Sequence, residues 1–133
     1  MGDPLRIAIC NHEPVFLSLM QRVLEADGYQ VTLCPEGTIA HSVIAREQPA
    51  LIVLDTWLET REGGWSLLQT LRLDDATRNL PILICSSDPE EVKRRMSQLQ
   101  TMPNITFLAK PFDPQTLLRS VRQSLESGVT SPK

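Results

Sequence analysis

The sequence has no excess of basic residues, few aromatic residues and no long apolar stretch. Its 13 Lys and Arg residues are outnumbered by 16 Asp and Glu residues, and aromatic residues make up 5% of the chain. Proteins that bind DNA or RNA directly usually carry a basic surface, so we expect no direct nucleic-acid partner. No segment approaches the roughly 20 apolar residues of a membrane-spanning helix, and the first residues do not form a charged-then-apolar leader. We therefore expect a soluble cytoplasmic protein that does not contact a membrane.

Cysteine is scarce as well. The chain has three, Cys10, Cys34 and Cys85, and no Cys-x-x-Cys pair. An odd number of cysteines at these spacings favours neither a disulfide framework nor a zinc site. We expect them to be reduced and mostly buried, as small hydrophobic residues.

A chain of 133 residues is the usual size of one domain and leaves no room for a second core. We place this domain at residues 1–128, where Gly128 closes it, and a short polar tail at residues 129–133. Any output of the protein is then expected to come from the surface of this domain.

Five short apolar runs, each of strand length, recur along the chain. They are continuous and rich in β-branched residues, as strands are when helices cover both faces of a sheet. They lie at residues 5–10, 29–33, 50–54, 81–85 and 105–109. This pattern predicts a central parallel sheet.

Segments with apolar residues at helical spacing follow each run. They lie at residues 14–26, 37–47, 64–73, 89–100 and 114–126. Right-handed crossovers in a chain of five such units favour a doubly wound three-layer α/β sandwich. The sequence thus predicts a (βα)5 fold of the flavodoxin-like type, with strand order 2-1-3-4-5.

Polar residues stand at the carboxyl ends of four of these strands. They are Asn11-His12-Glu13, Asp55-Thr56-Trp57, Ser86-Ser87-Asp88 and Lys110-Pro111. Open α/β sheets place their chemistry at this edge, in the crevice beside the point where the chain reverses direction. A carboxylate can attack a phosphoryl group there while a hydroxyl and an ammonium group bind its oxygens, and a divalent metal ion would complete the charge balance.

Three motifs in register resemble one family, and the resemblance covers nearly the whole chain. LIVLD at residues 51–55 resembles the strand that carries a phosphoacceptor aspartate, and PILICS at residues 81–86 the strand that ends in a switch Ser or Thr. FLAKPF at residues 107–112 resembles a Lys-Pro signature. Together with the polar end of the first strand, these motifs are similar to those of receiver domains of two-component response regulators.

The resemblance implies a role for each matching residue. Asp55 would accept a phosphoryl group from a sensor histidine kinase or a phosphotransfer protein, and Ser86 and Lys110 would bind its oxygens. The carbonyl of Trp57 would reach Mg²⁺, and Phe107 would be the rotating aromatic residue of the switch. Downstream protein partners, or a second copy of the chain, would use the face formed by residues 89–100, 105–109 and 114–126.

The first strand departs from the family pattern. Receivers usually present two adjacent acidic residues there for Mg²⁺, whereas this chain has Asn11 and His12, with an acid only at Glu13. Mg²⁺ prefers oxygen ligands in octahedral geometry, so an imidazole in place of a carboxylate weakens the site. The candidate metal-binding set is therefore Asp55, Glu13, His12 and the Trp57 carbonyl, with Glu13 compensating only if its side chain turns into the crevice.

Two functions from different classes remain open. The first is a stand-alone response regulator that is phosphorylated on Asp55 and catalyses at most its own phosphorylation and dephosphorylation. The second is a pseudo-receiver that lacks effective Mg²⁺ binding and acts as a phosphorylation-independent interaction module. A flavodoxin-type redox protein is disfavoured because residues 11–14 lack a phosphate-binding loop. A haloacid-dehalogenase-type phosphatase would need a second carboxylate at Trp57.

Several residues have simpler structural interpretations. His12 is more readily a residue at the start of a helix than a metal ligand. His41 is expected on an exposed, inert part of a helix, Trp65 in the core, and Trp57 at the surface. The basic run at residues 93–95 is usually a solvated helix face, although it also lies on the proposed partner face.

Overall fold

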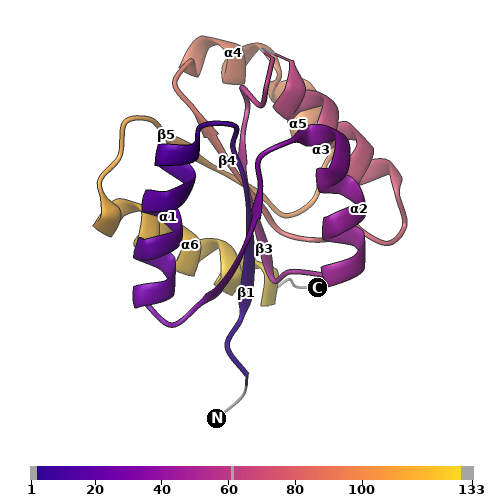
Figure 1. Cartoon of the computed structure of the whole chain (residues 1–133). Helices are drawn as coiled ribbons and strands as arrows, with labels where there is room; N and C mark the ends of the chain where they lie inside the picture. Colours follow the sequence, from indigo (N-terminus) through magenta and orange to yellow (C-terminus); the bar gives the residue numbers. More distant parts are fainter. Residues whose placement is uncertain (1–2, 61, 130–133) are drawn as a thin grey trace.

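The computed structural model describes residues 3–60 and 62–129 and contains one five-stranded parallel sheet (Figure 1). The strands are β1 (Arg6–Cys10), β2 (Gln30–Cys34), β3 (Leu51–Asp55), β4 (Ile82–Ser86) and β5 (Ile105–Ala109). They are ordered β2-β1-β3-β4-β5, which confirms the predicted flavodoxin-like topology. Four of the strands begin one residue later than expected, and β5 has the expected bounds.

Helices cover both faces of the sheet. They are α1 (Pro14–Ala26), α2 (Gly37–Glu47), α3 (Gly63–Leu73), α4 (Pro89–Arg94), α5 (Met96–Leu99) and α6 (Pro114–Val129). The helices α1 and α6 pack on one face, and α2 and α3 pack on the other (Figure 1). Each face therefore has its own hydrophobic cluster, as a three-layer sandwich requires.

The central strands explain why the runs are continuously apolar. Every residue of β3 and β4 is buried, because a helix layer lies over each face and a strand lies on each side. The outer strands β2 and β5 have exposed positions because each pairs with only one neighbour. Asp55 thus lies at the carboxyl end of the central strand, β3.

The predicted helix at residues 89–100 forms as two pieces. Arg95 has φ −98° and ψ 3°, so it ends α4 and precedes α5 instead of continuing one helix. Pro89 occupies the first turn of α4, and Asp88 Oδ1 accepts hydrogen bonds from the Glu90 and Glu91 N–H groups at 3.1 Å each. This cap fixes the start of α4 beside the end of β4.

The last helix is longer than predicted. It continues from Pro114 through Gly128 to Val129, so Gly128 does not end it. Residues 130–133 of the predicted tail lie outside the described residues.

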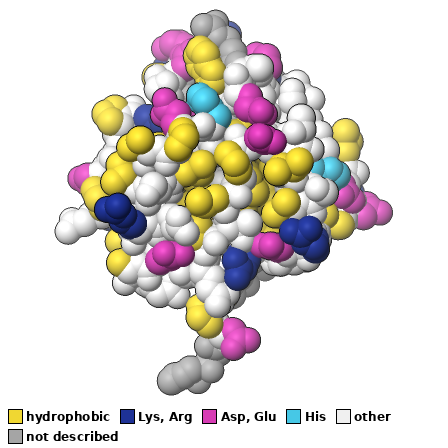
Figure 2. Space-filling view, in the orientation of Figure 1, with side chains coloured by type: hydrophobic (Ala, Val, Ile, Leu, Met, Phe, Trp, Pro, Cys, Tyr) yellow, Lys and Arg dark blue, Asp and Glu magenta, His cyan; other side chains and the backbone are white. Residues whose placement is uncertain are grey.

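One face of the molecule is unusually apolar at its surface. Figure 2 shows hydrophobic side chains gathered over the face formed by α1, β2 and α2. Val15 and Leu19 of α1, Leu33 of β2 and Ile39 of α2 are exposed there.

In the described part of the chain, no helix is long and apolar enough to span a membrane.

Candidate functional site

The carboxyl ends of β1, β3 and β5 meet around a cavity of about 630 Å³. Strand ends and the start of α4 contribute its walls, because parallel strands all finish at one edge of the sheet. The residues that line it are Asn11, His12, Glu13, Asp55, Thr56, Trp57, Ser87, Asp88, Glu91, Arg94 and Lys110. The topology thus gathers most of the predicted site residues in one place.

Asp55 is the buried carboxylate of this cavity, with 5% of its side chain exposed. Its Oδ1 accepts a hydrogen bond from the Trp57 N–H at 2.8 Å. Its Oδ2 accepts one from Asn11 Nδ2 at 2.9 Å and forms an ion pair with Lys110 Nζ. Donors from three separate strand ends therefore hold the carboxylate in one orientation.

Lys110 follows β5 and carries the positive charge of the site. Its backbone N–H donates to the Ser86 carbonyl at 2.9 Å, which joins the ends of β4 and β5. Its Nζ lies 5.0 Å from the centroid of the Phe16 ring, and the Lys110–Pro111 peptide bond is cis. The ammonium group thus contacts both the Phe16 ring and the Asp55 carboxylate.

Ser86 and Phe107 are the two predicted switch residues. Ser86 ends β4 and is buried, and its Oγ accepts a hydrogen bond from the Asp88 N–H at 3.0 Å. Phe107 is 40% exposed on the outer strand β5. In this conformation Ser86 supports the turn into α4, and Phe107 is exposed on β5 and does not line the cavity.

His12 and Glu13, which follow Asn11, line the cavity, but neither is hydrogen-bonded to Asp55. His12 is exposed, and its Nδ1 lies 3.2 Å from the Trp57 carbonyl oxygen. Glu13 is exposed at the start of α1, and its N–H donates to Asn11 Oδ1 at 2.8 Å. His12 is therefore a neighbour of the carbonyl that was predicted to reach Mg²⁺.

The donor set does not fit a hard divalent cation. The single buried carboxylate, Asp55, already accepts hydrogen bonds from an amide and an ammonium group, and the Asn11 oxygen accepts one from the Glu13 N–H. Among residues 3–60 and 62–129, no group of three or more His, Cys, Asp or Glu side chains is placed to hold a metal ion. Mg²⁺ needs several oxygen ligands that are free to coordinate, so this arrangement opposes it.

Two residues at the cavity were not singled out by the sequence motifs. Glu91 and Arg94 belong to α4 and line the cavity beside Asp88, the cap of that helix. Their position in the helix that follows β4 could have indicated that they lie at the cavity. The basic run at residues 93–95 was instead interpreted as a solvated helix face. Arg95, the next residue, packs its guanidinium group 4.5 Å from the Trp65 ring centroid and pairs with Glu62 at 2.7 Å.

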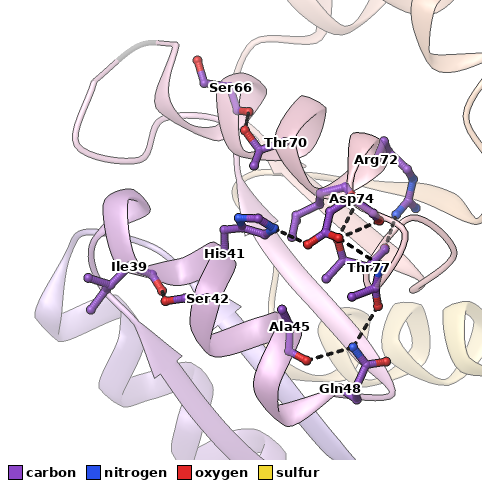
Figure 3. Close-up of polar contacts among 12 residues, drawn as sticks. Ile39, His41, Ser42, Ala45, Gln48, Ser66, Thr70, Arg72, Asp74 and Thr77 are labelled. Carbon is purple, nitrogen blue, oxygen red and sulfur yellow. Dashed lines mark hydrogen bonds and ion pairs between the residues drawn. The ribbon is translucent and has the colours of Figure 1, made fainter.

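His41 is not inert, contrary to the prediction. Its Nε2 lies 2.7 Å from Asp74 Oδ2, and this contact joins α2 to the end of α3 (Figure 3). The hydrogen bond from the Ala76 N–H, followed by the contact with His41, lowers the pKa of Asp74 below its usual value. Beside it, Gln48 Nε2 donates to the Ala45 and Ala76 carbonyls at 3.0 and 2.8 Å (Figure 3). This cluster lies outside the cavity and has a structural role.

Comparison with known protein families agrees with this geometry. The model of the response regulator receiver domain family matches residues 7–122. The probable transcriptional regulatory protein TcrX of Mycobacterium tuberculosis is 27% identical over 131 residues, which are 98% of this chain and 54% of TcrX. The chain spans about half the length of the curated relatives it matches.

Solved structures are similar along almost the whole chain. A sensor protein from Polaromonas sp. JS666 has a TM-score of 0.81 and 27% identity, covering 96% of this chain and 99% of that one. The receiver domain of a sensor histidine kinase from Pseudomonas aeruginosa has a TM-score of 0.79 and 27% identity, covering 93% of this chain and 99% of that one. That protein has a magnesium ion coordinated in its active-site cleft.

Proposed function

Because this chain belongs to the response regulator receiver family, we propose that it is a signalling domain whose phosphoacceptor is Asp55. The observation that carries this proposal is the ion pair between Asp55 Oδ2 and Lys110 Nζ at the carboxyl edge of the sheet. A buried carboxylate beside an ammonium group is prepared for nucleophilic attack on an anionic phosphoryl group, since the ammonium group offsets the added charge.

The proposed reaction transfers a phosphoryl group from a phosphohistidine of a sensor kinase or phosphotransfer protein. A carboxylate oxygen of Asp55 forms a bond to phosphorus while the bond between phosphorus and the histidine nitrogen breaks. The electron pair of that bond stays with the imidazole, which leaves as the neutral ring once it gains a proton from water. Lys110 and Ser86 would then bind the phosphoryl oxygens.

The signal would leave through the face formed by α4, β5 and α6. Ser86 Oγ now supports the Asp88 turn, so its movement toward a phosphoryl group would release the start of α4. The hydrogen bond between the Lys110 N–H and the Ser86 carbonyl joins this event to β5, where Phe107 is exposed. A protein partner or a second copy of the chain would respond to the change in that face.

Receiver domains typically bind Mg²⁺ in this cavity, and the residues found here do not fit it. The positive charge and donors that face the reaction therefore come from the Lys110 ammonium and Asn11 amide groups, which both contact Asp55 Oδ2. An amide offsets less negative charge than a divalent ion does, so we expect slow phosphorylation.

The same observation favours a second candidate function, a pseudo-receiver that binds partners without phosphorylation. Asn11 and Lys110 both contact Asp55 Oδ2, so the Asp55 carboxylate already has a donor and a counter-charge in place. A domain held in this way would present one constant α4, β5 and α6 face. The two functions differ in whether Asp55 ever reacts.

Intact-mass measurement after incubation with acetyl phosphate, with and without Mg²⁺, tests the proposal. We expect one added phosphoryl group in the wild type and none in Asp55→Asn. The matched control is Asp88→Asn, which changes another acid of the cavity and should retain the label. Label that persists in Asp55→Asn would overturn the assignment. An unlabelled wild type together with a labelled Asn11→Asp/His12→Asp variant would establish the pseudo-receiver instead.

A further inference from the structure

Two of the three cysteines face each other across neighbouring strands. Cys10 is the last residue of β1 and Cys34 the last residue of β2, and the two are direct partners in the parallel register. Both are 1% exposed, and both belong to the hydrophobic cluster on the α2 and α3 side of the sheet. Their side chains therefore lie on the same face of adjacent strands.

The register brings the two backbones to a separation that a disulfide bond can span. Neighbouring strands lie about 4.8 Å apart, and disulfide-bonded cysteines usually have Cα atoms about 4.4 to 6.8 Å apart. The neighbouring Cys10 thiol lowers the pKa of the Cys34 thiol, although burial and the charge of Glu47 oppose the change.

We propose that Cys10 and Cys34 form a peroxide-sensitive dithiol site that converts to an intramolecular disulfide. Neither residue takes part in the chemistry proposed for Asp55, so the site is a separate modification site of the domain. Its oxidant is a hydroperoxide, hydrogen peroxide being the smallest.

The reaction balances in two steps. The Cys34 thiolate attacks one oxygen of hydrogen peroxide, the oxygen–oxygen bond breaks, and hydroxide leaves, which produces a sulfenic acid on Cys34. The Cys10 sulfur then attacks the Cys34 sulfur, a sulfur–sulfur bond forms, and the sulfenic oxygen leaves as water. In total, two thiols and one hydrogen peroxide produce one disulfide and two waters.

The position of Cys34 gives the oxidant a route. Within the described sheet, β2 pairs only with β1, so its other edge is open, and Cys34 is the last residue before the loop to α2. The end of an outer strand opens by local fluctuation more readily than a central strand. A small oxidant can reach Cys34 during such an opening while the rest of the sheet stays folded.

The new bond would lie one residue from the cavity. Asn11, which follows Cys10, donates its N–H to the Cys34 carbonyl at 3.3 Å and its Nδ2 to Asp55 Oδ2 at 2.9 Å. A bond between Cys10 and Cys34 therefore constrains the backbone that positions the Asn11 amide. The dithiol site is in this way connected to the cavity without being part of it.

Cys85 serves as an internal control. It is buried in the other hydrophobic cluster, on the α1 and α6 side of the sheet. Burial, with a smaller contribution from Asp55, raises the pKa of the Cys85 thiol to about 12. Cys85 is thus a protonated thiol on the opposite face from the dithiol site, and it should stay reduced.

Thiol counting under native conditions tests the site. The full chain is treated with hydrogen peroxide, then denatured and alkylated, and its intact mass and non-reduced peptides are measured. We expect alkylation of one of the three cysteines, Cys85, and a peptide pair joined through Cys10 and Cys34, with dithiothreitol restoring all three. The Cys85→Ala variant should form the same disulfide, and Cys10→Ala and Cys34→Ala should form none.

Three results would overturn the proposal: alkylation of all three cysteines, a disulfide that includes Cys85, or disulfides only between chains. Circular dichroism of each variant shows whether it is folded. The Cys85→Ala result remains valid even if Cys10→Ala or Cys34→Ala does not fold. The Asp55→Asn variant should be oxidised like the wild type. Failure of the dithiol site is therefore distinguishable from failure of the phosphoacceptor assignment.

Discussion

Asn11 Nδ2 donates a hydrogen bond of 2.9 Å to Asp55 Oδ2, the same oxygen that pairs with Lys110. A receiver with an acidic residue at this position would instead place two carboxylates beside each other. A divalent cation would offset the repulsion between them. The Asn11 amide replaces that repulsion with a hydrogen bond to the Asp55 carboxylate. Four predictions test this arrangement and the fold that supports it.

The first prediction concerns Mg²⁺. We expect no calorimetric binding by the wild type at millimolar Mg²⁺, because Asp55 is the only buried carboxylate that lines the described cavity. The Asn11→Asp/His12→Asp variant adds two carboxylates and should bind Mg²⁺ at that concentration. Asn11→Ala is the matched control, since it removes the amide without adding charge, and it should show no Mg²⁺ binding. Millimolar binding by the wild type would mean that Glu13 turns inward.

The second prediction concerns the Asp55–Lys110 ion pair. Lys110→Met should lower the free energy of unfolding by about 1–3 kcal/mol at neutral pH, because Asp55 is left buried without its counter-charge. Adding Asp55→Asn should recover much of this loss in a double-mutant cycle measured by urea denaturation. Lys93→Met, which breaks an exposed pair with Glu90, should change nothing measurable. Additive effects of the two cavity mutations would show that the pair does not contribute.

The third prediction concerns Gly64, at the start of α3. A Cβ atom there would lie 2.1 Å from the Asp55 carbonyl oxygen and 2.6 Å from Thr56 Cα, so the helix could not pack against the end of β3. Gly64→Ala should lower the free energy of unfolding by about 3 kcal/mol or more. Gly28→Ala is the comparison: φ is +96°, no atom lies within 4 Å of the added Cβ, and a cost of about 1–2 kcal/mol is expected. Equal losses of unfolding free energy in Gly64→Ala and Gly28→Ala, measured by thermal or urea unfolding, would contradict the proposed clash at Gly64.

The fourth prediction concerns acid stability. The hydrogen bond from the Ala76 N–H, and then His41, lower the pKa of Asp74, and the Thr116 N–H lowers that of Asp113. A carboxyl whose folded pKa is lowered adds stability above its unfolded pKa of about 3.9, and that stability is lost as the pH falls through the folded value. The free energy of unfolding should therefore fall below about pH 4.

Urea denaturation from pH 6 to pH 3 measures this fall. Asp74→Asn and Asp113→Asn should each make the fall smaller, since each removes one of the titrating groups. Glu36→Gln is the control, because the Glu36 side chain makes no capping hydrogen bond, and it should leave the pH profile unchanged. If the free energy of unfolding of Asp74→Asn falls with pH as steeply as that of the wild type, the His41 and Asp74 cluster does not contribute to acid stability.

The number and order of the strands, and nearly all of the helices, could be predicted from the sequence. Continuous β-branched runs and helical spacing are local signals, and right-handed crossovers leave few sheet orders for five such units. The same order brings Asp55 and Lys110 to one edge, because both directly follow or end a strand of a parallel sheet. Their meeting was therefore predictable from sequence position.

The partner of each polar side chain, by contrast, could be identified only in the folded structure. Arg95, where the predicted helix breaks, contacts Glu62 and Trp65, and the His41 and Asp74 pair joins residues 33 positions apart. The amide of Asn11 faces Asp55 while His12 faces the Trp57 carbonyl, although the two are adjacent in sequence. Local sequence preferences determine where helices and strands begin and end. The hydrogen-bond partners of a polar side chain depend on which donors and acceptors the packing of the fold brings close to it.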